Sequence, residues 1–483
     1  MTLLLASATE LARLIRRREV SPVEVVRAHI DRIEAVNPRI NAVIRDRYAR
    51  ALDEARAAER RVLREPAAAL PPLLGVPCTV KAAYALGGMP WDVGILARAG
   101  IVAHEDGPPV AALRAAGAIP VAQTNVPEGL MWFETYNKLH GRTGNPYDPG
   151  RCPGGSSGGE GAIVGAGASP FGLASDVAGS IRFPAFFNGI FGHKPSGGRV
   201  TTAGQYPPTK GERARFLCSG PVSRRAEDLL PLLQILEQPG WTDSRGRAHP
   251  LRPRRRLVGG DLRGLRVRVA EENGHVHVTR EMRGAVRRAA DALADRGAEV
   301  RPWEGPTLKH AASIATALME EVDGWSFSQI LGDGEPIDLA RELLRAPLGR
   351  SAHILPSLGL VLIETLSPKV PGSARWLRQR QEEGRALRQA LEDQLGDDGV
   401  LLHPPFPRTA MRHGEALLQF VGASYCALFN VMWTPVTQVP LGLDRRGLPL
   451  GVQVIGAEGR DALTIAVARC LEDACGGWVP PEL

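Results

Sequence analysis

The chain has 483 residues, of which 44% are hydrophobic and 23% charged, a composition typical of globular proteins that excludes disordered, collagen-like and coiled-coil classes. The net charge is +7, yet most basic residues alternate with acids along predicted helices, so the charge does not favour a nucleic-acid partner. The exception is the run from Arg252 to Arg256. We interpret it as a solvated surface loop, with a phosphate or membrane-surface contact as the alternative.

Neither a metal centre nor a membrane span is predicted. The six cysteines form no Cys-x-x-Cys pair and no cluster with histidine, so we expect free thiols, a reducing cytoplasmic location and no metal. Residues 1–8 lack the basic and apolar regions of a signal peptide. The longest apolar stretch, Ile354 to Ile363, contains Pro356 and is far shorter than the roughly 20 residues of a spanning helix.

Two helices are predicted at the N-terminus, because Ser7 with Glu10, and Ser21 with Pro22 and Glu24, have the spacing of helix caps.

From residue 109 onward, helices and strands alternate at the spacing of βαβ units. A helix that ends at Gly117 precedes a strand over 119–122. Further strands are predicted over 265–270, 298–302, 436–441 and 450–455, and further helices over 280–295 and 461–473. This alternation indicates an α/β sheet with helices on both faces.

Two segments interrupt the alternation. Residues 238–264 are rich in proline, glycine and arginine and predict a long surface connection. Residues 311–385 predict helices with apolar patches and several prolines. The second segment is either ordinary helical packing or a cap over a binding cleft.

Glycine and serine are densest between Pro153 and Ser196, where two hydroxyl centres, Ser156 and Ser180, lie 24 positions apart. Such glycines let backbone N–H groups converge on one point, as in a phosphate cradle or an oxyanion hole. Glycines that serve only turns and helix packing explain the pattern equally well. No Gly-Lys dipeptide occurs, which excludes a Walker A loop, and no complete dinucleotide fingerprint is present.

A serine nucleophile needs a base. The triplet Gly154-x-Ser156-x-Gly158 matches the nucleophile elbow of α/β-hydrolases, but turn-forming residues precede it where an elbow requires a buried strand, and no histidine has a triad spacing. A neutral lysine can also activate serine. Lys81 lies in a strand-like apolar run and would have to lower its pKa by about 3 units, or about 4 kcal/mol, which burial can supply. A structurally paired lysine is equally compatible with the run.

Taken together, these residues resemble the amidase signature family. The stretch from Gly154 to Pro184, with Lys81 75 positions before Ser156, is similar to the family's highly specific pattern. The resemblance covers nearly the whole chain and includes Gly75 to Lys81, Thr124 to Glu128, Asn145-Pro146, Gly192 to Pro195 and Gly447 to Gln453. It is closest to fatty acid amide hydrolase-like bacterial amidases, and implies the amidase signature fold: a central mixed twisted β-sheet covered by helices on both faces, in one domain over residues 1–483.

The resemblance also implies a Ser-Ser-Lys triad. Ser180 would be the nucleophile, Ser156 the bridging serine held in a cis peptide, and Lys81 the base, while Asp176 and Arg182 are expected to hold the loop. The implied oxyanion hole consists of the backbone N–H groups of Val177, Ala178, Gly179 and Ser180. The family usually has glycine at position 178, where alanine would be strained if the backbone needs a positive φ.

The substrate is predicted from an apolar segment. Leu130, Met131, Trp132 and Phe133 lie where similar enzymes line their acyl pocket, so they favour a hydrophobic acyl or aryl group, with plain core packing as the alternative. We expect an amidohydrolase that forms an acyl-enzyme with a small-molecule amide and needs no cofactor. Carbamates and esters are expected side substrates, and a homodimer is one compatible assembly.

Two other functions are weighed against this one. A glutamine-dependent amidotransferase subunit of the same family would need partner proteins, tRNA, and polar groups that hold glutamine. A catalytically silent binding protein is disfavoured because Lys81, Ser156 and Ser180 are all present.

Overall fold

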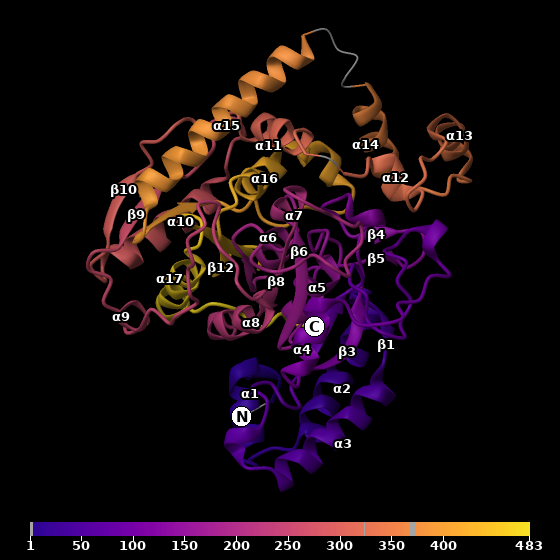
Figure 1. Cartoon of the computed structure of the whole chain (residues 1–483), viewed down its shortest axis with the longest axis vertical. Coiled ribbons are helices and arrows are strands. Elements are labelled where there is room, and N and C mark those ends of the chain that lie inside the picture. The colour runs from indigo at the N-terminus through magenta and orange to yellow at the C-terminus, as the bar shows by residue number, and fades with distance from the viewer. Residues whose placement is uncertain (1–2, 323, 367–371) are drawn as a thin grey trace.

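The computed structural model describes residues 3–322, 324–366 and 372–483, so residues 323 and 367–371 of the predicted helical segment lie outside the described residues. Its centre is an 11-stranded sheet in the order β1-β3-β2-β6-β8-β7-β12-β13-β11-β9-β10 (Figure 1). The strands are β1 (Val43–Asp46), β2 (Pro77–Lys81), β3 (Ile119–Thr124), β6 (Phe171–Asp176), β7 (Phe191–Lys194), β8 (Cys218–Ser223), β9 (Arg266–Val269), β10 (Glu299–Pro302), β11 (Gly399–His403), β12 (Val436–Leu443) and β13 (Pro449–Gly456). The short strands β4 (Tyr136–Asn137) and β5 (Gly141–Arg142) pair separately.

The sheet is mixed. Strand β2 runs parallel to β3 and β6, and β9 runs parallel to β10 and β11, whereas β6, β8, β7, β12 and β13 form consecutive antiparallel pairs. All residues of β2, β3, β6 and β8 are buried, as expected for strands covered on both faces. The predicted α/β fold class is therefore confirmed.

Helices flank the sheet (Figure 1). They are α1 (Ala8–Arg16), α2 (Pro22–Ile40), α3 (Tyr48–Arg64), α4 (Pro108–Ala115), α5 (Gly158–Gly165), α6 (Arg182–Phe187), α7 (Arg213–Phe216), α8 (Leu229–Leu236), α9 (Arg255–Val258), α10 (Arg280–Ala294), α11 (Ala311–Glu320), α12 (Phe327–Leu331), α13 (Leu339–Arg345), α14 (Leu355–Leu366), α15 (Ser373–Leu395), α16 (Ser424–Val431) and α17 (Asp461–Cys475).

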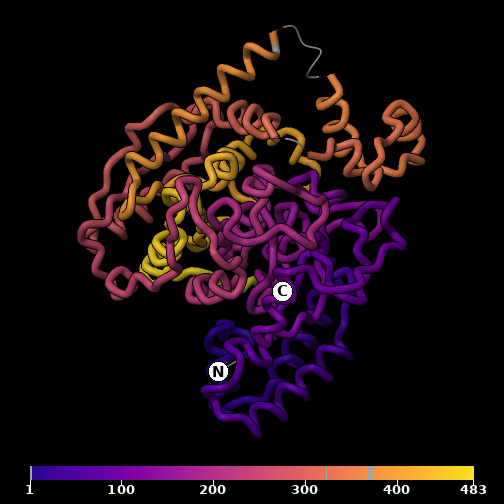
Figure 2. Tube along the Cα trace, in the orientation of Figure 1, coloured from indigo at the N-terminus to yellow at the C-terminus, as the bar shows by residue number. Residues whose placement is uncertain are grey.

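The predicted caps are present at the N-terminal helices. The Ser21 hydroxyl accepts the Glu24 N–H and the Glu24 carboxylate accepts the Ser21 N–H, which completes a capping box at α2. The Ser7 hydroxyl accepts the Glu10 N–H at α1. These helices form one end of the molecule (Figure 2). Near the C-terminus, β12 pairs with β7 and β13 pairs with β12 in the sheet.

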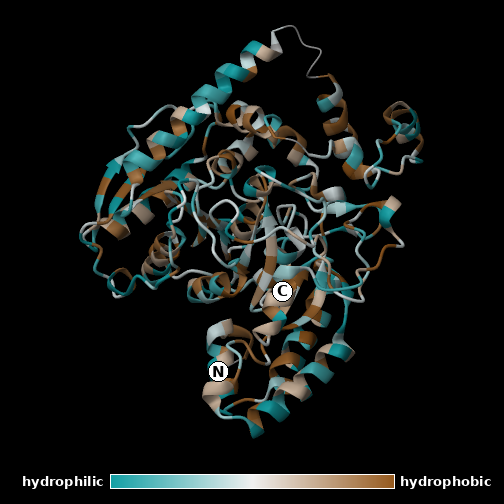
Figure 3. Cartoon of the chain, viewed as in Figure 1, coloured by the Kyte–Doolittle hydropathy of each residue, from teal (hydrophilic) through white to brown (hydrophobic). Residues whose placement is uncertain are grey.

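The segment 311–385 is helical in its described part, as predicted. Helix α15 is largely hydrophilic (Figure 3), but its buried residues Leu387, Leu391 and Leu395 pack in the same apolar cluster as residues of α11 and α16. Helices α12, α13 and α14 lie at the end opposite the N-terminal helices (Figure 1). Helices α11, α15 and α16 therefore share one apolar cluster.

Candidate active site

Lys81 is the last residue of β2, and its side chain is fully buried. Its amine Nζ lies 2.8 Å from the Ser156 hydroxyl, 2.9 Å from the Ser175 hydroxyl and 3.4 Å from the Ser175 carbonyl oxygen. A neutral amine has two N–H donors and one lone pair. A protonated amine would donate to all three oxygens, whereas a neutral amine can donate to the two oxygens of Ser175 and accept the proton of Ser156 with its lone pair.

Burial also favours the neutral form of this lysine. Loss of hydration lowers the pKa of Lys81 to about 7, although the charges of Asp176 and Glu160 favour the protonated amine. The burial predicted from the apolar run is thus present, and Lys81 can accept a proton near neutral pH.

Ser156 lies in the turn that precedes α5, and only 2% of it is exposed. The Gly155–Ser156 peptide bond is cis, as the family resemblance implies. Its hydroxyl faces Lys81 at the 2.8 Å distance given above.

Ser180 lies in the loop between β6 and α6 and is partly exposed. Within the described part of the chain its hydroxyl makes no hydrogen bond, so the structure joins Lys81 to Ser156 but does not join Ser156 to Ser180. Catalytic hydrogen bonds often tighten only when substrate binds. The partial exposure of Ser180 suits the residue that must meet the substrate.

The loop at Ser180 is held by a buried ion pair. The Arg182 guanidinium donates to both carboxylate oxygens of Asp176 at 2.9 Å, and both side chains are fully buried. Burial opposes the charge of Asp176, but the adjacent Arg182 outweighs it and holds the pKa of Asp176 below its ordinary value. Asn430 of α16 donates to the Asp176 carbonyl oxygen at 2.9 Å. Asp176 and Arg182 therefore hold the loop, as expected.

The four candidate oxyanion donors are not equally available. The Gly179 N–H donates to the Asp176 carboxylate at 2.7 Å. Among the described residues, the N–H groups of Val177, Ala178 and Ser180 have no hydrogen-bond partner. These three remain able to bind an oxyanion.

The expected strain at Ala178 does not occur. Ala178 is not among the described residues with positive φ, whereas the next residue, Gly179, has φ +117°. The left-handed conformation is thus placed on glycine, where it needs no Cβ.

The candidate substrate residues divide into two pairs. Leu130 and Met131 are partly buried, and Trp132 and Phe133 are each only 6% exposed. The Trp132 ring stacks on Phe420 with ring centres 5.9 Å apart.

Further aromatic contacts lead back to the nucleophile loop. Phe133 lies 6.2 Å from Phe183, whose ring occupies the space where a Cβ of Gly179 would stand. An aromatic chain through Phe420, Trp132, Phe133 and Phe183 therefore links the Ser180 loop to the surface, where Phe420 is 45% exposed.

The helices α12 and α14 attach next to this segment, at the 3₁₀ turn η4 (Glu128–Leu130). The buried Glu128 carboxylate contacts His353 Nδ1 at 2.9 Å and accepts the Ile354 N–H at 3.0 Å. The Tyr206 hydroxyl donates to the Ile330 carbonyl oxygen at 2.6 Å. These contacts join the start of α14 to Glu128 and join α12 to Tyr206.

Sequence reasoning gave no role to Ser175, Glu160 or Asn430. Ser175 lies at the end of β6, directly before the loop that carries Ser180. Its place beside that loop could have indicated from the sequence that it lies near the catalytic residues. Asn430 lies more than 250 residues away in sequence, and no local pattern could place it against Asp176.

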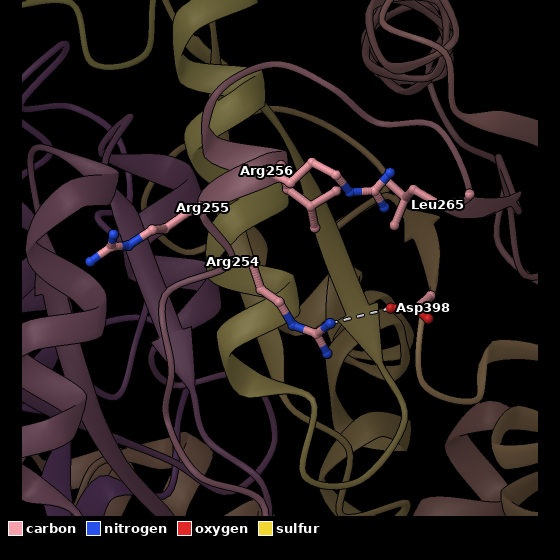
Figure 4. A pocket seen from close by; sticks show the side chains of 7 residues that line it. Arg254, Arg255, Arg256, Leu265 and Asp398 are labelled. Atoms are coloured by element: carbon pink, nitrogen blue, oxygen red, sulfur yellow. Dashed lines mark hydrogen bonds and ion pairs between the residues drawn. The ribbon is translucent and has the colours of Figure 1, made fainter.

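The arginine run lies elsewhere, at a surface hollow formed by α9, the residues just before β9 and the turn before β11 (Figure 4). Arg254 pairs with Asp398 at 3.3 Å, Arg256 donates to the Arg263 carbonyl oxygen at 2.6 Å, and Arg255 points away from both. Arg255 and Arg256 begin helix α9 instead of continuing the predicted loop, yet both are exposed. The run is thus solvated, as predicted.

No helix in residues 3–322, 324–366 and 372–483 is long and apolar enough to cross a membrane. Over the same ranges, no group of three or more His, Cys, Asp or Glu residues could hold a metal ion.

Comparison with known proteins gives consistent matches. The family model described as Amidase matches residues 24–465. Fatty-acid amide hydrolase 2-A of Danio rerio is 44% identical over 99% of this chain and 90% of that protein. Indoleacetamide hydrolase of Bradyrhizobium diazoefficiens is 30% identical over 97% of this chain and 86% of that protein. The solved structure of 6-aminohexanoate cyclic dimer hydrolase with substrate has a TM-score of 0.76 at 27% identity, and the match covers 98% of both chains.

Proposed function

Because this chain belongs to the amidase family and is an amide-cleaving hydrolase, we propose that it hydrolyses apolar carboxamides with Ser180 as nucleophile, Ser156 as bridge and Lys81 as base. The observation that carries this proposal is the fully buried Lys81 amine, which faces the Ser156 hydroxyl at 2.8 Å and has its pKa lowered to about 7.

The proposed reaction moves one proton along the triad and back. The lone pair of Lys81 takes the proton of Ser156 while Ser156 takes that of Ser180, and the Ser180 oxygen attacks the amide carbon. The N–H groups of Val177, Ala178 and Ser180 bind the resulting oxyanion. As the C–N bond breaks, Ser156 protonates the leaving amine and regains its proton from Lys81. Water then cleaves the acyl-enzyme by the same route.

The substrate class is inferred from the aromatic chain at Trp132. Phe420, which is 45% exposed, offers apolar surface to an acyl or aryl group, and the buried rings behind it continue the apolar surroundings to the Ser180 loop. The relative in Danio rerio is named for fatty-acid amides. Its 44% identity to this chain supports an apolar acyl group in the substrate. Glutamine, with a charged α-amino and a charged α-carboxylate group, is a poorer match to these rings than an apolar amide. Carbamates and esters remain proposed side substrates.

A panel of acyl p-nitroanilides and glutamine tests the substrate class. We expect release of nitroaniline from apolar anilides, and none from the Ser180→Ala variant. Ammonia release from glutamine that exceeds anilide hydrolysis would favour the amidotransferase instead.

The pH dependence follows from Lys81. Because the lysine must be neutral to act as base, kcat/KM for a neutral anilide should rise with pH through about 7 and reach a plateau on the alkaline side. A pH series from 5 to 10 at constant ionic strength, about 0.1 M, measures this. Residual hydrolysis by Lys81→Met should lack the transition, and a maximum near pH 5 in the unmodified enzyme would contradict the assignment.

Trp132 should set acyl preference. Trp132→Ala opens space beside Phe420, so the ratio of kcat/KM for bulky over short acyl anilides should rise about tenfold. Trp478→Ala is a matched control, since Trp478 is also buried but packs in a different apolar cluster from Trp132. An unchanged ratio in Trp132→Ala would place this side chain outside the pocket.

We also propose one amidase domain over residues 1–483, with 311–385 as an insertion; the family match over residues 24–465 supports this. A cytoplasmic location, a bacterial origin and a homodimer stay predictions.

A further inference from the structure

A second buried carboxyl group lies behind the Lys81 and Ser156 pair. Glu160 stands in the first turn of α5, four residues after Ser156, and is fully buried. Its carboxyl oxygens contact the hydroxyl of Thr79 at 2.6 Å and the hydroxyl of Thr124 at 2.9 Å. Thr79 precedes Lys81 by two residues on β2, and Thr124 is the register partner of Lys81 on β3. One side chain therefore ties the helix that follows Ser156 to both strands at Lys81.

The sheet provides a slot for this side chain. Gly172 of β6 is the register partner of Thr79, and a Cβ at position 172 would stand 1.8 Å from Glu160 Oε2. Any larger residue would therefore displace the carboxyl group. Burying a carboxyl is costly unless its hydrogen bonds are satisfied, and here both oxygens have a hydroxyl partner.

On this geometry, and resting on the proposed triad, we propose that Glu160 is a positioning residue that holds Ser156 against Lys81. The carboxyl group does not touch the substrate in this role. It fixes the first turn of α5 relative to the ends of β2 and β3, and so fixes the 2.8 Å contact between Lys81 and Ser156.

The charges around Glu160 are consistent with this role. Burial raises the pKa of Glu160 to about 8, against the hydrogen bonds from Thr79 and Thr124 and the charge of Lys81. The charge of Glu160 also raises the pKa of Cys78 and of Tyr84, and Asp176 is the other acid whose charge acts on Lys81. Glu160 and Asp176 are thus the two acids whose charges act on the Lys81 amine.

The test compares Glu160→Gln and Glu160→Ala with a matched buried carboxyl outside the site. Asp228→Ala serves as that control, because Asp228 is 1% exposed and accepts the N–H groups of Ala8 and Thr9. We expect Glu160→Ala to lower kcat about tenfold or more with little change in KM. Glu160→Gln keeps the shape, and its amide can accept from one threonine hydroxyl and donate to the other, so its kcat should stay within about threefold of the unmodified enzyme. Asp228→Ala should lose thermal stability but keep its kcat.

A second readout does not depend on turnover. With only six lysines in the chain, ¹³Cε-lysine NMR can follow the titration of Lys81 directly. Glu160→Ala should admit water and move this titration to higher pH, while Glu160→Gln should leave it nearly unchanged. If Glu160→Ala does not fold, Thr124→Val, which removes one of the two contacts, should lower kcat and shift the Lys81 titration in the same direction.

The outcomes separate the two proposals. If Glu160→Ala, or Thr124→Val in its place, changes neither kcat nor the Lys81 titration, the positioning role is wrong. If a fluorophosphonate fails to label Ser180 in the unmodified enzyme, the proposed triad is wrong, and the Lys81 titration still reports whether Glu160 controls the environment of that amine.

Discussion

Replacing Ser180 with alanine is expected to lower kcat for an apolar anilide about 10⁴-fold or more, because the attacking atom is gone. Lys81→Met should lose nearly as much, since no other base lies within hydrogen-bond distance of Ser156 in the described structure. Steady-state kinetics measure both losses, and circular dichroism establishes that each variant is folded. Ser169→Ala is a matched control, because Ser169 is also buried but donates to the Phe171 carbonyl oxygen.

Replacing the bridging serine tests whether Lys81 acts through Ser156. Ser156→Ala removes proton transfer worth about 10² to 10⁴-fold, yet a water molecule can partly replace the missing hydroxyl. Because Lys81 acts through Ser156, the double variant should be little slower than Lys81→Met alone. Losses that multiply in full would mean that the two residues act independently, and the relay would be wrong.

Breaking the Asp176–Arg182 pair should have the largest effect on stability. Asp176→Asn leaves the Arg182 guanidinium buried without its counter-charge, which is expected to cost about 3 to 5 kcal/mol in the free energy of unfolding. The loop should lose its geometry as well, because the Asp176 carboxylate also accepts the N–H groups of Gly179 and Ile181. Urea unfolding measures the first effect, and fluorophosphonate labelling the second.

An exposed pair provides the control for this substitution. Asp53 and Arg56 form a surface ion pair at 2.7 Å with both side chains more than half exposed, so Asp53→Asn should change stability far less. If Asp176→Asn is as stable as Asp53→Asn, the buried pair does not hold the loop.

Local patterns were sufficient for the central elements of the fold. The predicted strand over 119–122 corresponds to β3, those over 436–441 and 450–455 to β12 and β13, and the helix over 280–295 to α10. These segments combine clear hydrophobic periodicity with glycine or proline at their ends, so sequence and tertiary packing favour the same structure.

The site was less accessible to sequence reasoning. Apolar neighbours predicted the burial of Lys81, but its contacts with Ser175 depend on how β2 and β6 pair, which no local pattern specifies. The stacking of Phe420 on Trp132 joins segments nearly 300 residues apart. The Gly179 N–H donates to Asp176 only because of the conformation of the loop. The sequence alone therefore could not show which of the four predicted oxyanion donors are free.

The identity of the nucleophile can be measured directly by mass spectrometry after treatment with a serine-reactive fluorophosphonate. The proposal predicts one adduct on the peptide that contains Ser180, formed more slowly in Lys81→Met and absent from Ser180→Ala. An adduct on Ser156 or on another serine, or none in the folded unmodified enzyme, would contradict the assignment of Ser180 as the nucleophile.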